Sequence, residues 1–481
     1  MDAGRMREPA ARLRWSMLAA ALVALSSSLA ALGVEATYGA TVTADEPQYL
    51  LSAISLGEDL DLDISDELAA ERYRSFHRAA LNPQTRPLDA SGQRLSPHDP
   101  LLPLLLAAPV RLGGLAGARV AMALVAASAA ALTVWVSVRR YGVAPRVAAL
   151  VVASFFAASP LASYGAQIYP ELVAGVVVLV GLAAVTGRLG WGATAVGAVA
   201  VVALPWLAVK YVPVALVLAG ALVLRLDRTG RRRRALGVVG ALAASGVLYL
   251  AWHRAVYGGW TVYAAGDHFA DGEFGVVGFN PNYAARSRRL VGLLVDRRFG
   301  LAVWAPAWFA LPVSLGCVLR RRPAHWVLAV TLLAVAWASA TWIALTMHGW
   351  WWPGRQLVVG LPVAVVVVAA AADALRRMVA PIVVAGVVGA LSWLWIVVEA
   401  STGRLRLVID FEDTANPWYR LVSPLFPDLR IGSAGTALAT AGWALVVAAG
   451  VAWGWRASAG RGVAAARLGV AGRSRVDGPA P

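Results

Sequence analysis

The chain has 481 residues, of which 59% are hydrophobic and only 15% are charged. Its mean hydropathy is +0.65, which excludes a soluble globular protein and predicts an integral membrane protein. The formal net charge of +16 could suggest nucleic-acid binding, but much of the arginine falls in short runs between apolar segments. Such runs are typical of the cytoplasmic loops of membrane proteins.

Twelve apolar windows are long enough to cross a hydrocarbon core of about 30 Å. They predict an all-α, polytopic fold of about twelve transmembrane helices in a single domain, 15–455, between a cytoplasmic segment, 1–14, and a disordered cytoplasmic tail, 456–481. An even number of crossings puts both ends inside, which also puts four arginine runs on the inner side, in agreement with the positive-inside rule. The windows are 15–34, 116–138, 146–163, 171–187, 191–208, 211–226, 235–252, 299–319, 325–346, 356–375, 380–399 and 434–455. The runs are Arg139-Arg140, Arg231 to Arg234, Arg320 to Arg322 and Arg376-Arg377.

Three outer segments, 35–100, 253–298 and 401–433, are long enough to build a site. The stretch 99–113 is apolar but holds three prolines, so we expect it to lie along or dip into the outer surface rather than to span. Cys317 is the only cysteine, and it lies within an apolar window. An intramolecular disulfide and a thiolate metal cluster are therefore excluded.

Two adjacent carboxylates, Asp45 and Glu46, follow the first window and precede Pro47. On a helix they would point about 100° apart, so they cannot share one ligand side by side. One interpretation is a division of labour, in which one carboxylate faces a reaction and the other orients a base, an arginine or a metal. The alternative is a solvated helix start, because acids and an early proline both favour a helix amino end.

The run 58–63 alternates acidic and apolar residues, which invites comparison with a calcium-binding loop. That loop also requires glycine at its sixth position and an acid at its twelfth, where this chain has Ile64 and Ala70. We therefore reject the calcium loop and predict an exposed loop leading into a helix.

Candidate site residues recur in later outer segments. Glu171 begins an apolar window, so it either complements a helix dipole or points into a cavity at the outer face. Lys210, the sole lysine, lies between two windows, where it either snorkels to the interface or serves a function. Arg355 follows three tryptophans that alone would form an aromatic belt, and its guanidinium suits a pair of phosphate oxygens. The neighbouring candidates for substrate binding are Gln167, Tyr169, Glu171, Tyr211, Trp351 and His98; His268 and Arg297-Arg298 are weaker ones.

Acids on the first outer loop and cations on later ones are what transfer of a sugar from a lipid phosphate requires. The leaving phosphate gains negative charge as the glycosidic bond breaks, so positive groups stabilise the transition state. The acceptor hydroxyl must lose a proton, and a carboxylate within hydrogen-bonding reach is the usual base.

The order of these segments resembles the GT-C superfamily of polyprenyl-phosphate-sugar-dependent glycosyltransferases, which includes protein mannosyltransferases and lipid A aminoarabinose transferases. The matching stretches are 45–50, 167–171, 204–211 and 350–355. The resemblance implies that Asp45 is the catalytic acid residue of the first outer loop, that Glu46 is a second acid or a partner of a metal, and that a divalent cation is the one cofactor to consider. Lys210 and Arg355 are our candidates for binding the donor phosphate, because both are positively charged and both lie on the predicted outer side.

The leading hypothesis is an inverting transferase in the plasma membrane of a bacterium, with its active site on the extracytoplasmic side and Asp45 as general base. It would move a sugar from a polyprenyl-phosphate donor to a glycan, lipid or protein acceptor of the cell envelope. A multi-pass transporter or lipid flippase is the alternative, but it would place charged residues near the middle of the bilayer, and the windows hold few. An inactive relative that binds polyprenyl lipid is a third reading.

Overall fold

The computed structural model describes residues 3–85, 87–88, 90–262 and 282–459. These residues form helices, turns and loops, and their only β pairing is three isolated bridges, which confirms the predicted all-α fold class. The expected disorder of the tail after residue 459 and the candidate His268 both lie outside the described residues.

A helix occupies each of the twelve apolar windows. Within the described residues, six helical segments are long and apolar enough to cross a membrane, and four further apolar helices of 10–17 residues are shorter. The predicted polytopic helical fold is confirmed, whereas the count of twelve crossings is not. The helices are α1 (Ala3–Leu29), α4 (Leu101–Tyr141), α5 (Pro145–Phe156), α7 (Pro170–Thr186), α8 (Trp191–Leu207), α9 (Val212–Arg228), α10 (Arg232–Tyr257), α15 (Ala310–Arg321), α16 (Trp326–Ala338), α17 (Leu361–Ala374), α18 (Val379–Ser401) and α20 (Ala434–Ala457).

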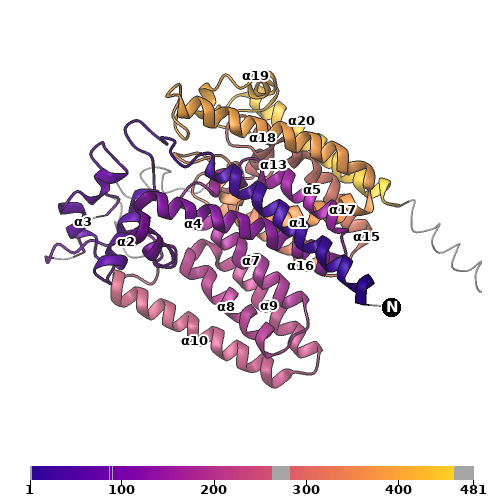
Figure 1. Ribbon diagram of the computed structural model, residues 1–481, viewed down its shortest axis with the longest axis horizontal. Helices are drawn as coiled ribbons and strands as arrows, with labels where there is room; N and C mark the ends of the chain where they lie inside the picture. The colour runs from indigo at the N-terminus through magenta and orange to yellow at the C-terminus, as the bar shows by residue number, and fades with distance from the viewer. Residues whose placement is uncertain (1–2, 86, 89, 263–281, 460–481) are drawn as a thin grey trace, which may run out of the picture.

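Helix α17 lies at the centre of the bundle. Eleven of its fourteen residues are buried, and it contacts α4, α5, α7, α15 and α16. Helices α8, α9 and α10 form a group on one side, and α18 and α20 lie on the other (Figure 1). Because α10 and α20 present apolar side chains that no other helix covers, these two groups fit the lipid-facing flanks of a membrane protein.

The first outer segment carries α2 (Glu46–Glu58), α3 (Ser65–Ala69) and a 3-10 turn, η1 (Arg72–Ser75). In Figure 1 these elements lie at the end of the bundle opposite the amino terminus. The three outer segments pack together: the Leu407 N–H donates to the Glu35 carbonyl at 3.0 Å, and the Leu429 N–H donates to Asp296 Oδ2 at 2.9 Å. Short helices complete the outer segments, namely α12 (Tyr283–Arg286), α13 (Arg289–Val295), α14 (Leu301–Trp304) and α19 (Pro417–Val422).

Helix α4 is broken near its beginning. Gly113 has φ −145° and ψ 16°, and Gly114 has φ 56° and ψ −141°, which separates residues 101–112 from the long segment that follows. The stretch 99–113 is therefore distinct from the span, as its prolines indicated, although it is helical. Arg111 Nη1 donates a 2.9 Å hydrogen bond to the Gly57 carbonyl at the end of α2, so the broken segment supports the first outer loop.

Candidate functional site

Helix α2 begins at the two acids. Asp45 is its N-cap residue and Pro47 lies in its first turn, where the missing N–H of proline costs nothing. Glu46 is completely buried, and its carboxylate accepts backbone N–H groups from Thr43 at 3.1 Å and from Ile168 at 2.8 Å. Glu46 therefore fastens the first outer loop to the segment before α7, while Asp45 points elsewhere, as expected for adjacent helical residues.

Asp45 belongs to a cluster of charged side chains that come from four segments far apart in the sequence. Arg355 Nη2 donates to Asp45 Oδ2 at 2.6 Å, and Arg355 Nε donates to Glu171 Oε1 at 2.8 Å. Lys210 Nζ donates to that same Glu171 oxygen at 2.8 Å. Glu171 is completely buried and Arg355 nearly so, whereas Lys210 retains a quarter of its side-chain exposure. The fold thus gathers two carboxylates and two cations into one cluster.

Aromatic rings surround the two cations. The Arg355 guanidinium lies 4.1 Å from the ring centroid of Tyr169 and 4.9 Å from that of Trp351. The Lys210 ammonium lies 5.4 Å from the ring of Tyr211. Rings at such distances stabilise a positive charge and hold a guanidinium plane in place. The substrate-binding candidates Tyr169, Tyr211 and Trp351 therefore all border the cluster.

The electrostatics of the outer loop favour an ionised Asp45. Burial by itself would raise the pKa of the Asp45 carboxyl, but the neighbouring basic groups, led by the Arg355 guanidinium, together outweigh it and hold that pKa well below its ordinary value. Burial lowers the pKa of His98, and the attraction of Asp45 offsets this only in part. At neutral pH the site therefore combines a carboxylate with a neutral imidazole, whose ring stacks on Tyr49 at a centroid distance of 4.4 Å.

Several buried polar atoms around the cluster lack a hydrogen-bond partner within the described residues. Glu171 shares only one oxygen with its cations, and its Oε2 atom has no partner. The unpartnered atoms near it are both amide atoms of Gln167 and of Gln48, His98 Nε2 and Trp351 Nε1. Burying such atoms unpaired costs free energy, so native proteins pair nearly all of them with protein, water or ligand. This concentration of open donors and acceptors fits the hydroxyl and phosphate groups of a sugar phosphate.

Asp99, which the sequence offered beside His98 only as a weaker candidate, supports Lys210, and its partners on α10 were missed. Asp99 Oδ2 accepts the Val209 N–H at 3.1 Å, directly before the lysine. Its Oδ1 accepts the Tyr249 hydroxyl at 2.7 Å and lies 3.0 Å from His253 Nε2. Asp99 therefore ties α10 to the turn that carries Lys210. Tyr249 and His253 gave no signal in the sequence, because Tyr249 lies within an apolar window and His253 directly follows it.

Arg119 is a second missed residue. It lies inside a predicted span, yet its guanidinium is almost fully buried and donates to the Leu32 and Thr41 carbonyls. Burial raises the pKa of Glu46, and the positive charge of Arg119 is the strongest of the interactions that lower it. A lone arginine in an apolar window could have identified it, since such residues usually have a partner. The weaker candidates Arg297 and Arg298 instead join the second and third outer segments.

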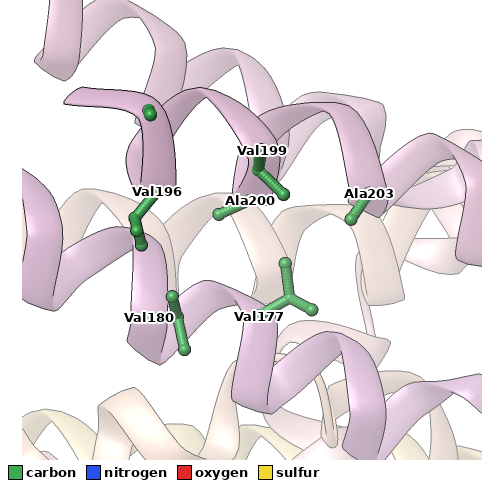
Figure 2. Close-up of a pocket in the computed structure, with 7 residues that line it drawn as sticks. Val177, Val180, Val196, Val199, Ala200 and Ala203 are labelled. Atoms are coloured by element: carbon green, nitrogen blue, oxygen red, sulfur yellow. The ribbon is translucent and has the colours of Figure 1, made fainter. Parts of the chain in front are cut away.

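A separate groove lies between α7 and α8 (Figure 2). It has a volume of about 290 Å³ and is lined only by valine and alanine, namely Val177, Val180, Ala195, Val196, Val199, Ala200 and Ala203. Its walls carry no polar group, so the groove suits hydrocarbon and not a charged substrate. The groove begins about two turns after the start of α7, the helix that carries Glu171 in its first turn.

No protein-family profile and no curated protein sequence matches this chain. The solved structures that are similar to it include two of ArnT from Cupriavidus metallidurans. The form bound to undecaprenyl phosphate has a TM-score of 0.47 and 13% identity, covering 91% of this chain and 76% of that one. The apo form has a TM-score of 0.44 and 15% identity, covering 90% and 76%.

Proposed function

We propose that this chain is a membrane glycosyltransferase that moves a sugar from a polyprenyl-phosphate donor to an acceptor at the outer face of a bacterial plasma membrane. The observation that carries the proposal is the cluster in which Arg355 bridges Asp45 and Glu171 while Lys210 shares the Glu171 oxygen. Four segments far apart in the sequence converge there, at the amino ends of α2 and α7 and beside an apolar groove.

Both cations keep hydrogen-bonding capacity for a donor phosphate. Lys210 uses one of its three N–H donors, and the Nη1 group of Arg355 makes no hydrogen bond within the described residues. The two carboxylates balance the two cations, so an incoming phosphate finds a site without excess negative charge. As the glycosidic bond breaks, the phosphate gains charge, and the two cations stabilise it more in the transition state than in the ground state.

Asp45 is the proposed general base. In the ion pair with Arg355 its pKa lies below the ordinary value, which makes it a weak base. A donor phosphate that binds the guanidinium competes with Asp45 for it, and the released carboxylate becomes a stronger base next to the acceptor hydroxyl. Binding of the donor would thus prepare the base. Glu46, engaged by two backbone N–H groups, would position this loop and take no proton.

Base-assisted attack of the acceptor hydroxyl on the sugar carbon, with departure of the lipid phosphate, is a single displacement. It inverts the configuration at that carbon. The outward orientation of the site rests on the arginine runs, which favour the opposite face as cytoplasmic. A glycan, a lipid or a protein of the cell envelope would be the acceptor.

The test is transfer of radiolabelled sugar by the purified protein in lipid nanodiscs, with a panel of polyprenyl-phosphate donors and envelope fractions as acceptors. We expect transfer from at least one donor, inversion in the product by NMR, and loss of transfer in Asp45→Asn. Asp227→Asn is the matched control, because this exposed aspartate lies at the far end of α9. Transfer by Asp45→Asn at the parent rate would remove Asp45 as the base, and no transfer from any donor would contradict the proposal.

A further inference from the structure

Six acidic residues lie between the end of α2 and the end of α3, and the structure divides them into two groups. Three of them are neutralised or hydrogen-bonded by protein groups. Glu58 forms a two-point ion pair with Arg72 at 2.6 and 2.8 Å. Asp61 accepts the Ser55 hydroxyl at 2.8 Å and the Asp63 N–H at 3.0 Å. Asp63 in turn accepts two backbone N–H groups, at 3.0 Å each, from Ser65 and Arg94.

The other three acids converge on one another. Asp59, Asp66 and Glu67 each offer a carboxylate oxygen, and these oxygens all lie within 4.8 Å of one another. Their carboxylates form no ion pair with a basic residue among the described residues. Arg72, the nearest arginine to act on them electrostatically, is already paired with Glu58. Three carboxylates in so small a space repel one another unless a cation or a shared proton lies between them.

Glu67 provides an independent sign of a ligand. Only 3% of this residue is exposed, and its Oε2 atom is buried without a hydrogen-bond partner. The Glu67 carboxyl shares a hydrogen bond with Asp66 inside the cluster, but the unpartnered Oε2 atom is still costly to bury, because it has lost its water. The Glu67 carboxylate contributes one oxygen to the group that it forms with Asp59 and Asp66, so a cation bound there would engage this carboxylate.

We propose that Asp59, Asp66 and Glu67 bind a hard divalent cation, with Ca²⁺ the best fit. The donor set consists entirely of carboxylate oxygens, which Ca²⁺ and Mg²⁺ prefer over softer metals. Ca²⁺ accepts six to eight oxygen ligands in flexible geometry, so it tolerates a site with two exposed carboxylates and completes its shell with water. Mg²⁺ needs near-ideal octahedral geometry and gives up its water reluctantly.

The ligands come from two helices and not from one continuous loop. Asp59 is the C-cap residue of α2, where the helix dipole adds further negative potential, while Asp66 and Glu67 lie in the first turn of α3. A cation would therefore clamp α3 onto the end of α2. Asp45 lies at the opposite end of α2, about 20 Å away at 1.5 Å per residue. The cation site is thus structural, and it is independent of the proposed sugar transfer.

The test is titration of Ca²⁺ into the purified full chain in lipid nanodiscs, after removal of bound metal, followed by calorimetry and by thermal unfolding. We expect one site with a dissociation constant on the order of 0.1–1 mM, as in extracellular calcium modules, and a Ca²⁺-dependent rise in the melting temperature. Mg²⁺ at the same concentration should give a smaller rise. Absence of a saturable Ca²⁺ signal would overturn the proposal.

Two variants identify the ligands. Asp59→Asn and Asp66→Asn change exposed side chains, so both should fold and both should weaken Ca²⁺ binding at least about tenfold, a loss of about 1.4 kcal/mol. Glu71→Gln is the matched control, because Glu71 is an exposed acid nearby that pairs with Arg74. It should bind Ca²⁺ as the parent does. An equal loss in all three variants would mean diffuse attraction to a negative loop and would overturn a defined site.

Discussion

Arg355 Nη2 lies 2.6 Å from Asp45 Oδ2, although 310 positions separate the two residues in the sequence. Glu171 accepts the Nε proton of the same side chain, so one guanidinium bridges the two carboxylates. Removal of this one side chain leaves two carboxylates in a largely buried place, with only Lys210 to offset them.

The first prediction concerns Arg355→Gln. Breaking a buried ion pair by removing one partner should lower the free energy of unfolding by about 3–5 kcal/mol at neutral pH. In the parent, the depressed pKa of Asp45 adds stability above the unfolded value near 3.8, and the gain is lost as the pH falls through the lower folded pKa. In the variant, burial without Arg355 raises the pKa of Asp45, so the variant should gain stability as the pH falls.

The difference in stability between the parent and Arg355→Gln should therefore be largest near pH 7 and should shrink toward pH 4. Thermal unfolding measured across that pH range checks this. Arg74→Gln is the control, because its exposed guanidinium pairs at 3.0 Å with Glu71, which is also exposed. Such a surface pair should cost no more than about 1 kcal/mol. A loss in Arg355→Gln that stays constant with pH would show that Asp45 does not depend on this guanidinium.

The second prediction concerns Glu46→Gln. Each oxygen of this carboxylate accepts one backbone N–H, and glutamine replaces one of the acceptors with an NH₂ donor. The mismatch should lower the free energy of unfolding by about 1–3 kcal/mol. Chemical unfolding measures this loss, and Glu71→Gln, at an exposed site, should change it by less than about 0.5 kcal/mol. Loss of sugar transfer in Glu46→Gln at unchanged stability would instead assign Glu46 to the reaction.

The third prediction links Asp99 to Lys210. Asp99→Asn weakens the acceptor that holds the Val209 N–H, so it should lower both kcat and kcat/KM for the lipid-linked donor, because Lys210 is proposed to act mainly in the transition state. If Asp99 acts through Lys210, Asp99→Asn should cause little further loss of transfer in a protein that already carries Lys210→Met. The double-mutant cycle should then give a coupling energy of about 0.5–3 kcal/mol.

Asp410→Asn is the matched control for that cycle, because Asp410 accepts the Tyr38 hydroxyl at 2.8 Å where two outer segments meet. Its effect and that of Lys210→Met should add within about 0.3–0.5 kcal/mol. Additive effects of Asp99→Asn and Lys210→Met would show that Asp99 supports the fold generally and not this lysine.

The fourth prediction concerns the break in α4. Gly114 has a positive φ with an extended ψ, a region essentially limited to glycine, so Gly114→Ala should cost about 1–3 kcal/mol. Gly113 has a negative φ, and an added Cβ meets open space at both positions, so Gly113→Ala isolates the backbone effect. Thermal unfolding should show a clear loss only for Gly114→Ala, and equal losses would contradict the strain argument.

Local patterns predicted much of this molecule. Apolar length is a property of contiguous residues, and it identified the polytopic helical fold, whereas the assignment of segments to the outer side stays a prediction. The main candidate residues lay in the first outer segment, in short connections between apolar windows or at the first residue of a window, because polar groups beside long apolar helices are few. The predicted number of twelve crossings is not confirmed, since several of the helices are shorter than a hydrocarbon core is thick.

The pairing of charges depended on the folded chain. That Arg355 meets Asp45, that two backbone N–H groups occupy Glu46, and that Asp99 supports the turn of Lys210 all follow from how helices distant in sequence pack. No spacing along the chain encodes these distances. The same holds for the acids after α2: the linear calcium pattern was absent, and only the approach of α3 brings Asp59, Asp66 and Glu67 together. Hydrophobic burial is decided by neighbouring residues, whereas a charge finds its partner only when the whole bundle has formed.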